Sequence, residues 1–409
     1  MNFFVEIKEG LLIAWDAIRA NKMRAGLTTL GIIIGVVSVT LMGAAIDGLN
    51  RSFRQSVSVL GADILFADRV NWFVNSEEEW IKVNNRRDIT LDQVKVVERQ
   101  MTLASAVAPV VQTSRSVRYL NRSTGGVVIF GTTEQYLQTA GLEVDEGRFL
   151  SAEDSEGGRP VCVIGYDVCT NLFVRESPLG KKIRIGPRWL EVVGVLAKRG
   201  SFMGMVSLDN QVIIPVQQLL LGYWRNPNFE IQVKAVDLAH LEDAKEELRG
   251  VLRKARHVAP GDPDDFAINQ QEQVIKMFHH LAGTIEAAGL SVTGLALFVG
   301  GIGIMNIMFV SVAERTREIG VRKAIGARRR TILLQFLIEA ASICLIGGLA
   351  GLAFVYVLTL ALSSFFSAGL SLPVTALAVL VSLLTGVVSG FLPAWRAARM
   401  DPVEALRNE

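Results

Sequence analysis

The residues whose types and spacing best suit recognition chemistry lie in the stretch ERTREIGVRKAIGAR, which begins at Glu314. Between Glu314 and Arg330 there are seven basic residues and two glutamates, so the stretch suits contact with an acidic surface. Ile319 and Ile325 offer apolar contacts, and Gly320 permits a tight bend. The pattern predicts a short amphipathic helix that binds a partner. The alternative is a basic loop that only fixes membrane orientation, although such a loop needs neither the glycines nor the glutamates.

Candidates for catalysis and metal binding are few. His279 and His280 are adjacent, so they point to different faces of a helix and make a poor metal pair. The patterns G-x-S-x-G, H-E-x-x-H and G-x-x-x-x-G-K-[ST] do not occur, so we expect no catalytic residue, metal site or bound cofactor on this chain. Cys162 and Cys169 could form a disulfide bond, but two unbonded thiols in neighbouring strand positions are the favoured interpretation.

Membrane-spanning helices must position the basic stretch. The chain has 409 residues, 50% hydrophobic and 20% charged, and its long uncharged runs lie towards the two ends. This segregation excludes a fully soluble enzyme, a disordered chain and a disulfide-stapled scaffold. Because a span needs about 20 apolar residues, we predict four of them, near 25–47, 287–312, 331–362 and 373–395. The predicted fold class is a membrane protein with four transmembrane helices and a large extracytoplasmic α+β insert between the first and second spans.

The distribution of lysine and arginine predicts the orientation. The N-terminal stretch, the loop between the second and third spans and the C-terminal tail together carry a net charge of about +6, whereas the insert is slightly acidic. Both termini and the basic loop are therefore expected in the cytoplasm, in a multi-pass protein of the cytoplasmic membrane with its large domain outside. The overall net charge of +2 gives no support for nucleic-acid binding.

Several residues in and near the spans suggest helix contacts. Residues 2–20 place apolar side chains three and four apart, which predicts a helix lying along the membrane lipids or packed on protein. Small residues four apart allow close helix packing, so we expect packing or dimer contacts at five positions. These are Gly31, Gly35, Gly300, Gly303 and Asn306.

Glu339 is the one carboxylate within the third span. Snorkelling, or pairing with Gln335 or a residue of the basic loop, would lower the cost of placing it there. A proton relay is the less favoured interpretation, because Glu339 has no second carboxylate nearby in the span.

The insert reads as two strand–helix–strand units around a middle section of short strands and turns. Its last segment keeps helical spacing up to the second span, which predicts a helix standing out of the membrane. The resulting division is 1–24 amphipathic helix, 25–47 first span, 48–286 external domain, 287–312 second span, 313–330 basic loop, 331–362 third span, 373–395 fourth span and 396–409 tail. Within the external domain, 57–131 and 228–270 form the α+β part, 132–227 the mostly-β insertion and 270–286 the stalk helix.

The basic stretch, the N-terminal AIRANKMRAGLTTLGIIIGVVSV and the C-terminal FLPAWRAARMDPVEALR together resemble the MacB/FtsX-like permeases of ABC transporters. The resemblance covers all four spans and the insert, and it is closest to the MacB branch. It implies a homodimer that acts with a separate cytoplasmic ABC ATPase, which binds ATP and Mg²⁺, because only about 24 residues precede the first span. It also implies that the basic stretch is the helix that couples to the ATPase. The residues so assigned are Glu314, Arg315, Thr316, Arg317, Glu318, Ile319, Gly320, Val321, Arg322, Lys323, Ala324, Ile325, Gly326 and Ala327.

The function implied by the resemblance is mechanotransmission, in which ATP hydrolysis moves the external domain and the substrate is handled outside the membrane. Exported drugs, peptides or lipid-linked molecules are the expected substrates, with a periplasmic adaptor and an outer-membrane duct as further partners in the MacB branch. The alternative is an FtsX-like or lipoprotein-releasing type of regulator that acts on a cell-envelope partner. A membrane-anchored enzyme is the least favoured alternative, because the insert carries no catalytic constellation.

Overall fold

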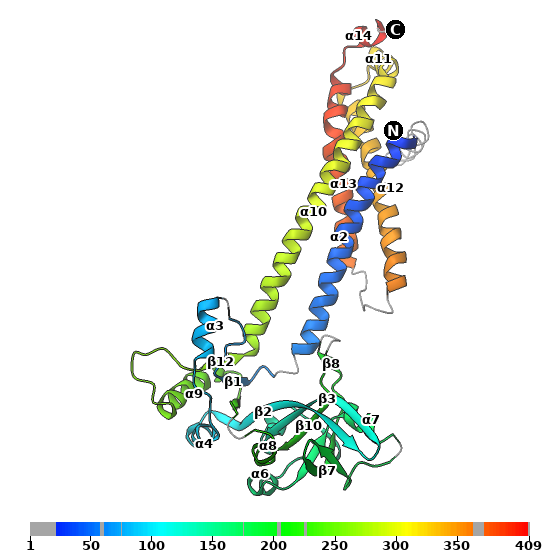
Figure 1. The fold of residues 1–409 in the computed structure, drawn as a ribbon. Helices are drawn as coiled ribbons and strands as arrows, with labels where there is room; N and C mark the ends of the chain where they lie inside the picture. The colour runs from blue at the N-terminus through cyan, green and yellow to red at the C-terminus, as the bar shows by residue number, and fades with distance from the viewer. Residues whose placement is uncertain are drawn as a thin grey trace. The chain divides into compact units, whose positions relative to one another are not determined.

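The computed structural model describes residues 22–57, 61–74, 76–174, 176–202, 206–224, 227–362 and 372–407. The chain divides into two compact units (Figure 1). One unit combines Met1–Arg51 with His279–Glu409 and is helical, and the other is Ser52–Phe278. The helix expected over residues 2–20 lies outside the described residues.

The helical unit is built on four long helices, each with an apolar stretch long enough to cross a membrane. They are α2 (Lys22–Val57), α10 (Gln271–Glu314), α12 (Arg329–Leu362) and α13 (Leu372–Arg399). The prediction of four spans with a large insert between the first and second is therefore confirmed. α10 runs without a break through both segments that the sequence assigned to a stalk and a second span.

Close approaches at small residues hold these four helices together. A Cβ atom added to Gly31 on α2 would lie 2.9 Å from the Cα of Gly300 on α10, so two backbones touch at this point. Eleven residues along α2, the side chain of Met42 packs over Gly289 of α10. Gly386 of α13 packs on α12, where its Cβ would lie 2.9 Å from the Cα of Ala341. The apolar centre between the helices is formed by side chains such as Ile32, Val36, Ile304, Met308 and Phe336.

The second unit, which we call the inserted domain, is built on one sheet in the described part of the chain. Ten strands contribute, in the order β12-β1-β11-β2-β3-β10-β5-β7-β4, and β6 pairs with β2 and β7. These strands are β1 (Ile64–Asp68), β2 (Ala104–Tyr119), β3 (Arg122–Thr132), β4 (Val144–Gly147), β5 (Val161–Ile164), β6 (Lys182–Ile185), β7 (Arg188–Leu196), β10 (Gln211–Pro215), β11 (Glu230–Ala235) and β12 (Ala267–Gln270). A separate hairpin joins β8 (Ser201–Phe202) to β9 (Val206–Ser207).

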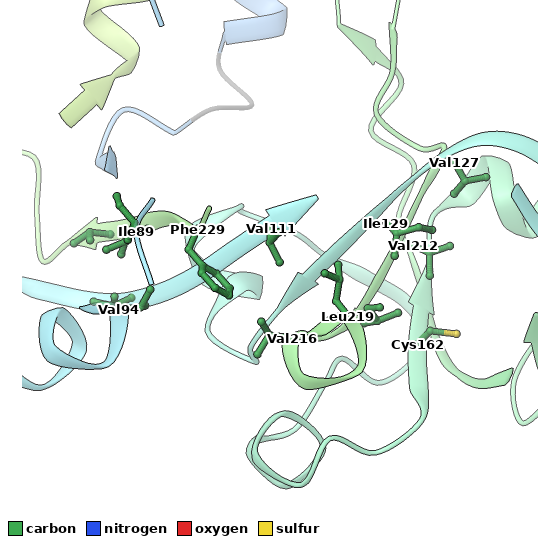
Figure 2. Close-up of a cluster of buried hydrophobic side chains, with 14 of the residues drawn as sticks. Ile89, Val94, Val111, Val127, Ile129, Cys162, Val212, Val216, Leu219 and Phe229 are labelled. Atoms are coloured by element: carbon green, nitrogen blue, oxygen red, sulfur yellow. The ribbon is translucent and has the colours of Figure 1, made fainter. Parts of the chain in front are cut away.

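Strand β2 connects the two halves of the sheet. Its first residues pair with β11, and from Val111 onward it pairs with β3 and then β6. The first half carries α4 (Leu91–Gln100) and α9 (Leu241–Ala255) on one face, where alternate residues of β1 and β11 such as Leu65 and Ile231 are buried. The apolar core continues from Ile89 and Val94 in this half to Val212 in the other (Figure 2).

The expected strand–helix–strand units are present, with two differences. Helix α3 (Glu77–Asn84) was not expected, although Ser76 accepts a hydrogen bond from the Glu79 N–H in an N-cap that the sequence pattern S-x-x-E signals. The section expected to be mostly β also contains the short helices α5 (Tyr136–Thr139), α6 (Ala152–Gly157), α7 (Tyr166–Leu172) and α8 (Val216–Gly222).

The cysteines of the inserted domain are unbonded, as favoured from the sequence. Their expected placement in neighbouring strand positions is wrong for one of them. Cys162 lies buried in β5, but Cys169 lies on α7, because Gly165 ends the strand and begins a helix four residues earlier.

Within the inserted domain, the rings of Phe53 and Phe278 stack with centroids 3.7 Å apart and planes 7° from parallel. Phe53 is the last described buried residue of α2, and Phe278 belongs to the first turns of α10. This contact therefore joins the two helices that connect the inserted domain to the chain on either side.

Candidate functional site

The basic stretch forms a helix that is shorter than predicted. α10 ends at Glu314, Arg315 takes a non-helical conformation, and α11 spans Thr316–Ala324. Gly326 has φ +95°, and the Gly326 and Ala327 N–H groups donate to the carbonyl oxygens of Lys323 and Arg322. This is a Schellman motif, which requires the glycine and ends the helix. The two ends of the predicted range, at Glu314 and at Ile325 to Ala327, therefore lie outside α11.

Helix α11 is held in place along one side. Ile319 is buried against the apolar centre of the helical unit. Arg322 donates from Nη1 to Oε1 of Gln335 on α12 at 2.7 Å. Lys323 donates from Nζ to the carbonyl oxygen of Met400 at 2.5 Å, which ties α11 to the segment after α13. Burial lowers the pKa of Lys323, and the nearby Arg329 adds to this effect while Asp401 opposes it.

A buried ion pair anchors the turn that begins α11. Glu339, inside α12, is 2% exposed, and its Oε2 lies 3.4 Å from Nη1 of Arg315. The hydroxyl of Ser311, in the last turn of α10, lies 3.5 Å from the other carboxylate oxygen. The predicted pairing of Glu339 with a residue of the basic loop is confirmed. Gln335, the other predicted partner, instead bonds Arg322.

The opposite side of α11 is open. Arg317, Glu318, Val321 and Ile325 are exposed, with Ile325 82% accessible. The adjacent α14 (Pro402–Arg407) packs against α11 through buried Ala405. On α14, Val403 is 72% exposed. We call the exposed residues of α11, of its C-cap and of α14 the loop surface: Arg317, Glu318, Val321, Ala324, Ile325, Val403 and Glu404.

The chemistry of the loop surface is that of a protein contact. Large exposed apolar side chains are bordered by the charged Arg317, Glu318 and Glu404, and an apolar patch with a polar rim is typical of protein interfaces. The surface is fixed from behind by the Arg322, Lys323 and Arg315 contacts, so it is presented in a defined position.

The residues predicted to form helix contacts divide into two groups. Gly31, Gly35 and Gly300 lie between α2 and α10 of the same chain, where a Cβ on Gly35 would lie 2.6 Å from Leu297. Gly303 is half-buried, and Asn306 is exposed on α10. Asn306 continues a stripe of exposed apolar residues that includes Leu295, Val299 and Ile302. Within the described residues its side chain makes no hydrogen bond.

Two family models match the chain. Residues 25–251 match the MacB-like periplasmic core domain, and residues 290–402 match the FtsX-like permease C-terminal domain. The first match alone covers more than half of the chain. The chain belongs to the MacB/FtsX-like permease family.

Relatives of this MacB/FtsX-like chain include named exporters. It is 34% identical over 413 residues to the macrolide export ATP-binding/permease protein MacB of Bdellovibrio bacteriovorus, covering 99% of this chain and 62% of that protein. It is 33% identical to the pyoverdine export ATP-binding/permease protein PvdT of Pseudomonas syringae, covering 99% of this chain and 60% of that protein. The chain thus spans less than two thirds of the length of these relatives.

The inserted domain also has a structural relative. The crystal structure of the periplasmic region of MacB from Actinobacillus actinomycetemcomitans is similar, with a TM-score of 0.44 and 19% identity. The similarity covers 55% of this chain and 95% of that one.

The inserted domain of this MacB/FtsX-like chain offers little for catalysis or metal binding. Within the described residues, no group of three or more His, Cys, Asp or Glu side chains could hold a metal ion. His240 and Asp237, a pair that the sequence did not point to, lie with Nδ1 and Oδ1 2.7 Å apart. The same carboxylate accepts from the His240 N–H, so this pair belongs to the turn that begins α9.

Proposed function

We propose that this chain is the permease subunit of a MacB-like ABC exporter and that an ABC ATPase docks on the loop surface. One observation carries the proposal: α11 presents exposed Val321, Ile325 and Arg317 while Arg315, Arg322 and Lys323 fix it from behind. A helix with one fixed side and one open side, on which apolar residues lie beside Arg317 and Glu318, suits contact with a partner protein. ATP and Mg²⁺ would bind the ATPase, since the G-x-x-x-x-G-K-[ST] pattern does not occur in these 409 residues.

The proposed mechanism is mechanotransmission. Only Arg315 separates α11 from α10, and α10 begins at the last strand of the inserted domain. A movement of α11 driven by the ATPase would therefore act on α10 and reach the inserted domain through it. The substrate, a drug, peptide or lipid-linked molecule, would be handled by the inserted domain outside the membrane.

The proposal includes the arrangement of partners. Both termini and the loop surface lie in the cytoplasm, as the excess of lysine and arginine in these segments favours. Two copies associate in the membrane, and Asn306 is the side chain whose exposure among apolar residues most favours such a contact. A periplasmic adaptor and an outer-membrane duct complete the exporter as in the MacB branch.

The test of ATPase docking is a pair of charge reversals. The full chain is purified in detergent with the ABC ATPase encoded beside it, and ATP turnover and complex formation are measured for Arg317→Glu and Arg330→Glu. Both changes alter the net charge equally, but only Arg317 belongs to the loop surface. We expect Arg317→Glu to weaken the complex roughly tenfold or more and Arg330→Glu to leave it nearly intact. Equal effects, or no complex for the unaltered chain, would refute docking at this surface.

A transport assay then separates the exporter from the FtsX-like alternative. The complex is reconstituted in vesicles, and ATP-driven movement of labelled macrolide, peptide and lipid-linked substrates is followed. Movement of any of them that is lost with Arg317→Glu supports the exporter. A complex whose ATPase is active but which moves none of them favours a regulator of a cell-envelope partner.

A further inference from the structure

Arginines gather where α12 begins and where α13 ends. The two helices pack closely and run in opposite directions, so the start of one lies beside the end of the other (Figure 1). The arginines at this end are all exposed, and we call them the arginine cluster: Arg328, Arg329, Arg330, Arg396 and Arg399. The cluster belongs to the helical unit and shares no residue with the loop surface.

The packing of α12 on α13 brings the members of the cluster to one level. Gly390 of α13 packs on Leu337 of α12, whose Cδ2 would lie 4.0 Å from a Cβ on this glycine. Each helix rises about 1.5 Å per residue, so about two turns further on Arg330 is level with the segment from Arg396 to Arg399. The cluster therefore combines charges from both helices, and the positive end of the α12 dipole adds to them.

The chain does not balance the charge of the arginine cluster. The ion pairs among the described residues of the helical unit are formed by Arg315 and Arg322, which are not members of the cluster. No aspartate or glutamate occurs between Glu339 and Asp401. The carboxylate of Asp401 accepts a hydrogen bond from the Val403 N–H at 2.8 Å and so caps α14. The five guanidinium groups thus form a positive patch that is open to an anion from outside the chain.

The cluster lies at the end of an exposed apolar face of α13. Val388, Leu392, Trp395 and Arg399 follow one another at intervals of four, three and four residues, and all of them are exposed. They therefore share one outer face of the helix. Apolar residues, a tryptophan and an arginine in this order match the passage from the hydrocarbon core of a membrane to its headgroup region.

Trp395 fixes the direction of Arg399. The guanidinium carbon of Arg399 lies 4.2 Å from the centre of the Trp395 ring, which is a cation–π contact. Stacking uses the flat face of the guanidinium and leaves the N–H groups along its edge for an acceptor with two oxygens. The phosphate of a phospholipid presents such oxygens at the depth where tryptophan lies.

We propose that the arginine cluster binds the headgroup phosphate of an anionic phospholipid, whose acyl chains lie along the exposed apolar face of α13. The occupant is a lipid because the cluster continues a face of a membrane-spanning helix, and a soluble protein does not reach into hydrocarbon. A headgroup with a net negative charge is preferred over a zwitterionic one, because four to eight basic residues beside a span attract anionic lipid. The inference depends on the spans and not on the proposed ATPase contact.

The test counts the lipids bound to the full chain in a neutral detergent. Native mass spectrometry compares phosphatidylglycerol with phosphatidylcholine of the same acyl chains. We expect phosphatidylglycerol to bind roughly tenfold more tightly, and the double variant Arg396→Gln, Arg399→Gln to lose this preference with its charge-assisted hydrogen bonds. The matched control is Arg118→Gln, Arg184→Gln, which removes two exposed arginines that are partners on β2 and β6, and it should keep the preference.

A variant on the other helix guards against an effect that is confined to the end of α13. Arg330→Gln should also weaken binding of phosphatidylglycerol severalfold, while the size-exclusion profile and thermal unfolding remain those of the unaltered chain, because the side chain is exposed. Glycerol 1-phosphate, which has the phosphate without acyl chains, should not displace the lipid at millimolar concentration.

Four results would overturn the inference. The two lipids bind alike, the Arg396 and Arg399 double variant keeps the preference, or glycerol 1-phosphate displaces the lipid and so defines a site for soluble phosphate. The fourth is that the double variant loses the ABC ATPase as fully as Arg317→Glu does while it still binds phosphatidylglycerol, which would assign the cluster to a protein contact.

Discussion

The carboxylate of Glu339 lies 3.4 Å from the guanidinium of Arg315, and Arg315 is the single residue at which the chain turns from α10 into α11. Glu339 belongs to α12 and is almost completely buried, whereas Arg315 is partly open. The pair therefore fastens the base of the loop surface to a spanning helix that follows it in the chain. Its removal should affect the position of α11 more than the fold of the inserted domain.

Glu339→Gln should destabilise the helical unit by about 1–3 kcal/mol, because Arg315 loses its buried carboxylate partner. Arg315→Gln should cost a similar amount, and the double variant should cost less than the sum of the two. Thermal unfolding in detergent gives these free energies, and ATP turnover of the complex reports coupling. Strict additivity of the two changes would show that the pair contributes nothing.

Ile325→Asp should weaken ATPase binding by about 1–3 kcal/mol, because it places a charge in the most exposed apolar position of the loop surface. Its stability should be unchanged, since the side chain is 82% exposed. The matched control is Leu120→Asp, at a residue 81% exposed in the β2–β3 turn of the inserted domain. Co-purification with the ATPase measures both. If the two variants bind equally well, Ile325 lies outside the contact.

Gly31→Ala should destabilise the helical unit by about 1–3 kcal/mol, since its Cβ would press on the Cα of Gly300 and neither backbone can yield easily. Gly48 lies on the same helix with open space around its Cβ position. Gly48→Ala should therefore be neutral, or stabilising by up to about 1 kcal/mol. Unfolding in detergent compares the two. A Gly31→Ala chain as stable as the unaltered one would contradict the close α2–α10 contact.

Asn306→Leu should weaken self-association by about 1 kcal/mol, because an amide facing hydrocarbon gains a hydrogen bond only in the dimer. Sedimentation in detergent, at several protein concentrations, measures the dissociation constant. Ile302→Leu lies one turn away on the same exposed stripe and keeps the surface apolar, so it should leave the constant unchanged. If the Asn306→Leu variant associates more tightly than the unaltered chain, the exposed stripe on α10 faces lipid and is not the dimer contact.

Glu230 makes the inserted domain sensitive to pH. Burial raises the pKa of Glu230 to about 7; its hydrogen bond with Gln232 opposes this rise, and the carboxylate of Asp68 adds to it. The folded state holds this proton more tightly than the unfolded state, so the contribution of Glu230 to the free energy of unfolding is largest at low pH and is lost as pH rises towards 7. The fall should amount to at most about 3 kcal/mol. Unfolding curves between pH 4.5 and 8 should be flatter for Glu230→Gln than for the exposed control Glu143→Gln.

The spans could be predicted from the sequence because an apolar run of about 20 residues has few other uses. The sequence also predicted a new helix directly after the second span, but it did not show that Arg315 at this turn pairs with Glu339 of α12, because the two residues are 24 positions apart in the chain. The partner of Gly31 was hidden for a similar reason. The glycine spacing within α2 predicts that Gly31 lies at a close helix contact. It does not identify Gly300 as the neighbour, because that depends on how α10 packs beside α2.

In the inserted domain, the hydrophobic runs predicted most strands but not their extent. β2 continues to Tyr119, well beyond the apolar segment SAVAPVV, because its second part exchanges hydrogen bonds with β3 and β6 instead of burying both faces. A cavity of the inserted domain, lined by side chains that include Asp63, Arg199 and Lys234, could not be predicted at all. Its lining comes from four segments that are far apart in the sequence and share no motif.

The contacts between α2 and α10 repeat every eleven residues on both helices: Gly31 with Gly300, Met42 with Gly289, and Phe53 with Phe278. Eleven residues make three turns at 3.67 residues per turn, almost the natural winding of an α-helix, so neither helix has to twist to keep these pairs facing. Successive contacts along the two helices are thus about 16 Å apart. Within the helical unit, sliding α2 along α10 would separate Gly31 from Gly300 and Met42 from Gly289, so these two contacts oppose displacement of the helices along their axes.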